Sequence, residues 1–168
     1  MSDKTTQELQ ALVHALAWND AFGCYTRQGF EKLVWPEIAN DARYIVYFDI
    51  NDMHMLNEKF GSYDPVDHMV KTALGTVRVS DFVAGQWKSG DEFLICLTEP
   101  LGNGWDQQES RRELDPFEMV SRLEDALAEQ GLSATFAVTR VTSHDLHAVM
   151  QPAVDTVYRS KKQRGVGR

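Results

Sequence analysis

The chain has 168 residues, which is enough for one domain with a substantial core, and its formal net charge at pH 7 is -8. This charge argues against general affinity for DNA or for an anionic membrane, although it is compatible with a local basic pocket for a nucleotide. The two cysteines, Cys24 and Cys96, are typical of a reduced chain, the N-terminal segment is too polar for a signal peptide, and no apolar run is long enough to span a bilayer. We therefore expect a cytoplasmic protein with neither DNA nor a membrane as a partner.

The segment from Thr5 to Ala17 shows the apolar spacing of a helix. Four residues form its stripe: Leu9, Leu12, Val13 and Leu16. Because about two heptads are short for a coiled coil, we expect this stripe to pack on the domain. The alternative is that it pairs with a second copy of the chain.

A loop that contains Gly23 leads into a second helix, for which Thr26 is the predicted N-cap. Leu33 and Val34 should face inward in that helix. We expect Trp35-Pro36 to end it, because the residue before a proline disfavours the helical conformation.

Four segments are predicted to be strands. The run from Arg43 to Asp49 is apolar apart from its ends, so we expect a central strand covered on both faces. Asp81–Trp87 and Glu92–Leu97 should form a hairpin, and Leu132–Val141 a further strand.

Helices are predicted between and after these strands. A short helix follows Asp49 and ends at Gly61, and a second begins with Asp64 as N-cap and Pro65 as N1. The inward stripe of the second helix is Val66, Met69, Val70, Ala73, Leu74 and Val77.

Two more helices lie towards the C-terminus. Asp115-Pro116 with Glu118 begins a helix that Gly131 ends, and Pro152–Gln163 forms the last helix. In the last helix Val154, Val157 and Tyr158 should point inward. The segment from Thr98 to Leu114, between the hairpin and these helices, should be an exposed loop.

The order of elements predicts an α+β fold, an α/β sandwich whose mostly antiparallel central sheet is covered by helices.

Three acidic residues stand at strand ends that this sheet would bring together. Asp49 ends the central strand, and Asp91 and Glu92 follow Ser89-Gly90, the predicted turn of the hairpin. Carboxylates that converge in this way repel one another unless a cation lies among them, and oxygen ligands suit Mg²⁺. The pattern predicts a site for phosphoryl transfer.

Four segments together resemble the GGDEF domain of diguanylate cyclases. NDAFGCYTRQGF is similar to the opening loop D-x-L-T-G-L-x-N-R-R-x-F, and FDINDMHMLNEKFG to D-I-D-x-F-K-x-I-N-D-x-x-G. SGDEF stands where the family has GGDEF or GGEEF, and VDTVYRSKK is similar to the closing A-D-x-A-L-Y-x-A-K. The four occur in the family's order across residues 19–165, which makes the resemblance far more specific than any one motif. It implies a palm-like fold related to nucleotide cyclases and polymerases.

The resemblance implies a divalent cation, Mg²⁺ or Mn²⁺, held by Asp49, Asp91 and the carbonyl oxygen of Ile50. It implies that Glu92 helps to bind the cation or to deprotonate the attacking ribose 3′-hydroxyl. The structural alternatives are a helix N-cap for Asp49 and a solvated hairpin turn for Asp91 and Glu92.

The resemblance also implies nucleotide-binding residues. Asn57 would read the guanine edge, Lys161 would contact the triphosphate, and Arg164 would reach phosphate from the helix end. Ser89 and Gly90 would lie against the nucleotide in the signature turn. Asn57 and Lys161 also suit ordinary positions near helix ends.

Several residues depart from the family pattern. Val66 stands in place of the second base-reading aspartate and also continues an apolar stripe, so it either borders the nucleotide or packs. Loss of a buried hydrogen-bond partner costs about 1–3 kcal/mol of binding free energy, which would weaken the preference for guanine over adenine. His54 stands in place of a phosphate-binding lysine and is predicted to contact phosphate in its stead. Ser89 replaces the first signature glycine, and Asn19 and Asn51 replace aspartates.

An R-x-x-D pair, Arg78 and Asp81, has the pattern of the family's inhibitory site for cyclic di-GMP. The pair lies two residues farther from Ser89 than the family spacing. A helix-terminal arginine and a strand-opening aspartate explain the two residues at least as well.

We therefore predict an N-terminal helix over residues 1–18 and a GGDEF-like domain over 19–168. The predicted function is a cation-dependent enzyme that joins two nucleoside triphosphates, GTP or ATP, into a cyclic dinucleotide as a homodimer. The alternative is a degenerate domain that senses a nucleotide or regulates a partner without catalysis. A third interpretation is a minimal signalling cyclase akin to the palm-type polymerases of CRISPR defence.

Overall fold

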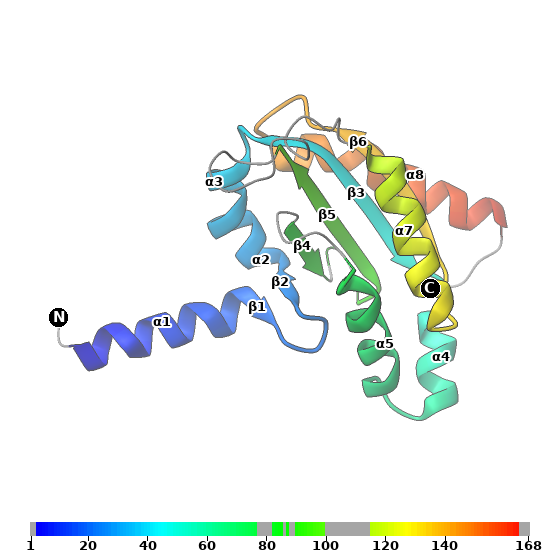
Figure 1. The fold of residues 1–168 in the computed structure, drawn as a ribbon, viewed down its shortest axis with the longest axis horizontal. Coiled ribbons are helices and arrows are strands. Elements are labelled where there is room, and N and C mark those ends of the chain that lie inside the picture. Colours follow the sequence, from blue (N-terminus) through cyan, green and yellow to red (C-terminus); the bar gives the residue numbers. More distant parts are fainter. Residues whose placement is uncertain (1–2, 77–81, 86, 88–89, 100–114, 165–168) are drawn as a thin grey trace.

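A six-stranded sheet lies at the centre of the computed structural model, which describes residues 3–76, 82–85, 87, 90–99 and 115–164 (Figure 1). The strands are β1 (Trp18–Asn19), β2 (Cys24–Thr26), β3 (Ala42–Ile50), β4 (Phe82–Gly85), β5 (Glu92–Thr98) and β6 (Ala134–Arg140). The helices are α1 (Asp3–Ala17), α2 (Arg27–Gly29), the π-helical turn η1 (Phe30–Val34), α3 (Trp35–Ile38), α4 (Met53–Phe60), α5 (Asp64–Leu74), α7 (Pro116–Glu129) and α8 (Leu146–Arg164).

The strand order is β1-β2-β4-β5-β3-β6, and β3 pairs antiparallel with both of its neighbours. β4 and β5 form the predicted antiparallel hairpin, and β2 joins β4 in parallel. The sheet is therefore mixed but mostly antiparallel, and the predicted α+β class with a central β3 is confirmed.

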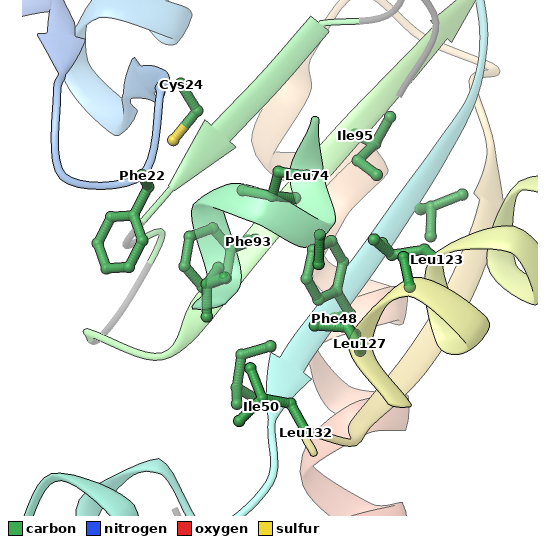
Figure 2. Packing of buried hydrophobic residues seen from close by; sticks show 14 of the residues in the cluster. Phe22, Cys24, Phe48, Ile50, Leu74, Phe93, Ile95, Leu123, Leu127 and Leu132 are labelled. Atoms are coloured by element: carbon green, nitrogen blue, oxygen red, sulfur yellow. The ribbon is translucent and has the colours of Figure 1, made fainter. Parts of the chain in front are cut away.

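One face of the sheet packs against α5 and α7 (Figure 2). Phe48 of β3 lies at the centre of this cluster, where its ring stacks on Phe93 and on Phe136 with centroids 5.5 and 5.3 Å apart. Leu123 and Leu127 of α7 are buried in the same cluster. This aromatic stack holds β5, β3 and β6 together on one side.

The other face packs against the segment from η1 to α3 and against α8. Its strand residues alternate with those of the first face, as the two-residue period of a strand requires. Ile45 and Tyr47 of β3 and Leu94 of β5 are buried here, beneath Trp35 of α3 and Val157 of α8. Coverage of β3 on both faces, as predicted from its apolar sequence, is confirmed.

Helix α1 extends away from the sheet (Figure 1) and does not bury its apolar stripe. Leu12 is 56% exposed and Leu16 is 58% exposed, and Leu9 and Val13 are also exposed. The expectation that this stripe packs on the domain is therefore wrong. Only Ala17, the last residue of α1, is buried within the helix.

The end of α1 is held by contacts from the start of the next helix. Thr26 Oγ1 donates a hydrogen bond of 2.8 Å to the carbonyl of Leu16 and accepts one of 3.0 Å from the amide of Gly29. A Cβ atom on Gly29 would lie 2.5 Å from Cα of Ala17, so only glycine permits this approach. The predicted N-cap role of Thr26 is confirmed.

The helices around Pro36 and Pro152 differ from the prediction. Trp35-Pro36 does not end a helix, because the π-helical turn η1 passes directly into α3 and places the proline in its first turn. The same wide turn buries Phe30 and Val34 and leaves Leu33 half exposed, so the inward orientation predicted for Leu33 is wrong.

The last helix begins before Pro152, at Leu146, because Asp145 accepts hydrogen bonds from the amides of Ala148 and Val149. Its buried face includes Val157, and Tyr158, one residue further around the helix, is exposed, contrary to the prediction.

Two other helix ends agree with the sequence. Gly61 ends α4 with a φ of 74°, and Asp115 caps α7 by accepting from the amides of Phe117 and Glu118. The start of α5 differs by one residue: Tyr63 is the N-cap and Asp64 is already in the helix, so the N-cap role predicted for Asp64 is wrong. Most of the predicted loop from Thr98 to Leu114, and Val77 of the α5 stripe, lie outside the described residues.

Among the helices that the structure describes, none combines the length and hydropathy needed to cross a bilayer.

Candidate cation and nucleotide site

The register of β3 against β5 brings the predicted acids together. Asp49 is paired directly with Glu92, so both side chains lie on the same face at one end of the sheet. Asp91 precedes β5, and its carbonyl accepts a 2.9 Å hydrogen bond from the amide of Ile50. One carboxylate oxygen from each of the three acids lies within 4.8 Å of the others.

All three acids are buried, which is rare for carboxylates without a partner. Asp49 is only 2% exposed, and burial raises its pKa to about 7. A hydrogen bond from Lys161 opposes this rise in pKa, and the nearby charge of Asp91 adds to it. The site therefore concentrates negative charge where little water is present to solvate it.

Lys161 supplies a positive charge inside this cluster. It lies near the end of α8 and is 6% exposed. Its Nζ atom is 2.7 Å from Oδ1 of Asp49 and donates a 3.1 Å hydrogen bond to the carbonyl oxygen of Ile50. The ammonium group thus contacts two atoms that the family resemblance assigns to the cation.

Tyr47 is a member of the site that sequence reasoning missed. It lies two residues before Asp49 on the same face of β3, and its hydroxyl forms a hydrogen bond with Glu92. Burial raises the pKa of Tyr47, and the charges of Glu92, Asp49 and Asp91 raise it further, so the hydroxyl remains a neutral donor. The two-residue period of the strand was the signal that could have identified it.

The turn after β3 is fixed by Asn51, which stands where the family has an aspartate. Its side-chain amide donates to Oγ of Ser133 at 3.0 Å, and its Oδ1 accepts from Oγ1 of Thr135 at 2.9 Å. Asp52 then adopts the left-handed conformation with a φ of 57°, and α4 begins at once. Asn51 therefore ties the end of β3 to β6 rather than adding a fourth acid to the cluster.

Helix α4 carries two of the predicted nucleotide-binding residues. The Oδ1 atom of Asn57 is buried and has no hydrogen-bond partner among the residues that the structure describes. Such an atom is unfavourable unless a ligand satisfies it. His54 is exposed on the same helix, with Nε2 3.2 Å from a carboxylate oxygen of Glu58.

Of the remaining predicted residues, Val66 is buried in the core, Gly90 adjoins the acids, and the others fall outside the described residues. Val66 is completely buried in the cluster beneath α5, in agreement with the packing alternative, so its side chain offers no surface to a ligand. Gly90 is exposed beside Asp91. The predicted roles of Ser89, of the side chain of Arg164, and of the Arg78 and Asp81 pair fall outside the described residues.

The donor atoms around Asp49 fit a hard divalent cation. Three carboxylates and the backbone carbonyl of Ile50 supply oxygen donors. Mg²⁺ and Mn²⁺ prefer such donors to softer sulfur ligands. None of the donors in this cluster is a histidine or cysteine. The buried acidic cluster could therefore bind such a cation.

No family model and no curated protein matches the chain in sequence. Solved structures match its fold. The coiled coil and GGDEF domain of DgcB from Caulobacter crescentus, solved in complex with c-di-GMP, gives a TM-score of 0.69 at 15% identity over 96% of this chain and 88% of that one. A microbial GGDEF domain solved with bis-cyclic di-GMP gives 0.67 at 17% identity over 90% and 94% of the two chains.

A larger protein matches over only part of its length. The apo S helix-GGDEF-EAL structure of LapD from Vibrio cholerae gives a TM-score of 0.67 at 12% identity, over 93% of this chain and 37% of that one. The chain therefore has the fold of GGDEF domains.

Proposed function

We propose that the chain is a divergent GGDEF domain that condenses two nucleoside triphosphates into a cyclic dinucleotide in the presence of Mg²⁺ or Mn²⁺. The observation that supports this function is the convergence of three buried carboxylates from β3 and the start of β5. Burying them costs stability in the absence of a ligand, so a chain without a cation to bind would have little reason to keep all three.

In this proposal Asp49, Asp91 and the Ile50 carbonyl hold the cation, which when bound would neutralise charge on the triphosphate. Glu92 either adds a ligand or takes the proton of the attacking ribose 3′-hydroxyl. Tyr47, through its hydrogen bond, holds the Glu92 carboxylate in one orientation. Two 3′–5′ bonds form and two pyrophosphates leave, with positioning and charge rather than a protein nucleophile lowering the barrier.

Recognition of the base would rest on Asn57, whose unsatisfied buried oxygen can accept a hydrogen bond from an amino group. Lys161 and Arg164 of α8 would contact phosphate, and so would His54, which lies on α4 with Asn57. Val66 offers no carboxylate to hydrogen-bond guanine. We therefore expect the preference for guanine over adenine to be weaker than it would be with an aspartate at this position.

Condensation of two triphosphates requires two domains to face each other, and α1 offers a means of pairing. Its exposed stripe, Leu9, Leu12, Val13 and Leu16, would be covered by a second copy of the chain. The matching DgcB structure likewise includes a coiled coil with its GGDEF domain. We therefore propose a homodimer in which residues 1–18 pair and residues 19–168 carry the catalytic domain.

The function is tested by incubating the protein with labelled GTP, ATP or both, in the presence of Mg²⁺. We expect release of pyrophosphate and a cyclic dinucleotide. Asp91→Asn should abolish product, whereas Asp125→Asn, which removes an exposed acid of α7, should leave the rate unchanged. Absence of product from every mixture, at protein concentrations at which the dimer has been demonstrated, would exclude catalysis.

A second function, nucleotide or cyclic dinucleotide sensing without catalysis, is favoured by one observation. Val66 is buried, so the base site has lost a recognition group that a catalytic GGDEF domain would use. Calorimetry separates the two functions, because a sensor should bind a cyclic dinucleotide without Mg²⁺. In that case Asp49→Ala should leave the affinity unchanged.

A further inference from the structure

We propose that Lys161 is an internal counter-ion that occupies the cation site until a nucleotide is bound, so that Lys161 and the divalent cation compete for the same oxygen atoms. This inference rests on the cation site of the proposed function. It concerns what fills that site in the protein alone, and how nucleotide binding would open it.

The contacts of Lys161 are those of a cation and not of a surface side chain. Its Nζ atom meets one carboxylate oxygen of Asp49 at 2.7 Å and the adjacent backbone carbonyl of Ile50 at 3.1 Å. Both lysine and aspartate side chains are almost completely buried in this pair. The ammonium group therefore supplies charge and hydrogen bonds to the same two atoms that would ligate Mg²⁺.

Simultaneous occupation of this site is unfavourable. A divalent cation bound to Asp49 and Ile50 would stand beside the ammonium group, and like charges at contact distance repel strongly where little water screens them. Binding of the cation to the protein alone must therefore expel the ammonium group of Lys161. We therefore expect the affinity of the nucleotide-free protein for a divalent cation to be reduced by the cost of that step.

A triphosphate offers the displaced ammonium group a new partner. Lysine has a flexible four-carbon stem, and Lys161 lies three residues before the end of α8, so its head group can turn from Asp49 towards phosphate oxygens. A nucleotide that engages Lys161 would free the oxygens of Asp49 and Ile50. The nucleotide and the cation would then bind cooperatively, and the protein alone would hold little divalent cation.

The next residue provides a matched control. Lys162 follows Lys161 on α8 and is exposed to solvent. Lys161→Met and Lys162→Met each remove one positive charge from the same turn of the same helix. A difference between these variants therefore reports the position of the ammonium group and not the net charge of the protein.

The experiment titrates the nucleotide-free full chain with Mn²⁺ and follows the free ion by electron paramagnetic resonance. We expect Lys161→Met to bind Mn²⁺ about tenfold more tightly than the unmodified protein, and Lys162→Met to remain within about twofold of it. Equal affinities of the Lys161→Met variant and the unmodified protein would overturn the inference and leave the proposed function intact. If neither the unmodified protein nor the Lys161→Met variant binds Mn²⁺, with or without a non-hydrolysable triphosphate, both the inference and the proposed function fail.

A second measurement uses the unmodified protein and does not depend on how well a variant folds. The rate of acetylation of each lysine is followed by mass spectrometry in the absence of nucleotide. Lys161 should react far more slowly than Lys162 before Mn²⁺ is added, and Mn²⁺ alone should increase the rate at Lys161 only. An unchanged rate at Lys161 under conditions where Mn²⁺ binds would show that the ammonium group does not leave, and would overturn the inference.

Discussion

Helix α1 and the acidic end of β3 depart from ordinary burial in opposite ways. The apolar stripe of α1 is exposed, whereas Asp49, Asp91, Glu92 and Lys161 are buried. Each arrangement costs stability in the isolated chain, because apolar surface is left in water in one case and charge is removed from water in the other.

The two regions nevertheless differ in how their cost is offset. The buried acids have a compensating group within the same chain, because Lys161 lies against Asp49. Leu12 and Leu16 remain exposed to solvent, and α1 extends away from the sheet (Figure 1). In the single chain Lys161 therefore offsets part of the cost of burying the acids, whereas no described element offsets the exposure of the α1 stripe. The cation and the second copy of the chain that we propose would offset what remains in each region.

The largest effect on stability is expected from Lys161→Met, which removes the compensation at the acidic site. In EDTA at pH 9 it should lower the free energy of unfolding by about 3 kcal/mol, because the ionised Asp49 is left without its ion-pair partner and must take up a proton to remain buried. Burial raises the pKa of Asp49 to about 7, so the loss should diminish as the pH falls below this value and the carboxyl becomes protonated.

Urea unfolding at pH 9 and pH 6 measures this loss. Lys162→Met should change the free energy of unfolding by no more than about 0.5 kcal/mol at either pH. Equal stabilities of the two lysine variants would show that the ion pair does not compensate the buried acid.

The next effect concerns the attachment of α1. Gly29→Ala places a Cβ atom 2.5 Å from Cα of Ala17, and a backbone atom cannot move aside as a side-chain tip can. We expect a loss of about 1–3 kcal/mol in the free energy of unfolding and faster proteolysis within α1. Gly75→Ala, where the nearest atom would be a carbonyl oxygen at 3.2 Å, should have a smaller effect on both.

A smaller effect on folding, but a large one on association, is expected from charges on the exposed stripe. The double variant Leu12→Glu and Leu16→Glu should leave the unfolding free energy of the monomer within about 0.5 kcal/mol, because both side chains are already exposed. Its dimer dissociation constant, measured by sedimentation, should rise at least about tenfold. Gln7→Glu and Ala11→Glu add the same charge to the opposite side of α1, and if they weaken the dimer equally, the stripe is not the interface.

The smallest effect is expected for chemical modification of Cys24, a buried thiol that needs no counter-ion. Burial raises the pKa of Cys24 to about 12, while a backbone hydrogen bond with Gly85 acts in the opposite direction. The thiol is therefore neutral at pH 8, and Cys96 is equally inaccessible. Iodoacetamide should modify neither cysteine in the folded protein and both in urea, and rapid modification of the folded protein would show that the sheet opens locally.

Much of the sheet and of the acidic cluster could be predicted from local sequence. The apolar run before Asp49 identified a central strand, and Gly61 and Asp115 marked helix ends through their own conformations and capping bonds. The predictions at Pro36 and Pro152 failed because each proline was taken as a boundary, although a π-helical turn accommodates the first and a cap at Asp145 starts the last helix earlier.

The sequence by itself determined the four longer strands, the positions of acids at strand ends, and the apolar face of α1, because these features depend on local spacing. It did not identify β1 and β2, which fall where a loop was predicted and which join the sheet through the pairing of β2 with β4. Only the tertiary structure decided that Asp49 is paired with Glu92 and that the apolar face of α1 is left exposed by the part of the chain that the structure describes. It also decided that Lys161, 111 residues from Ile50 along the chain, meets the Ile50 carbonyl. The physical reason is that register and long-range contacts arise from the packing of both sheet faces as a whole, which no local pattern encodes.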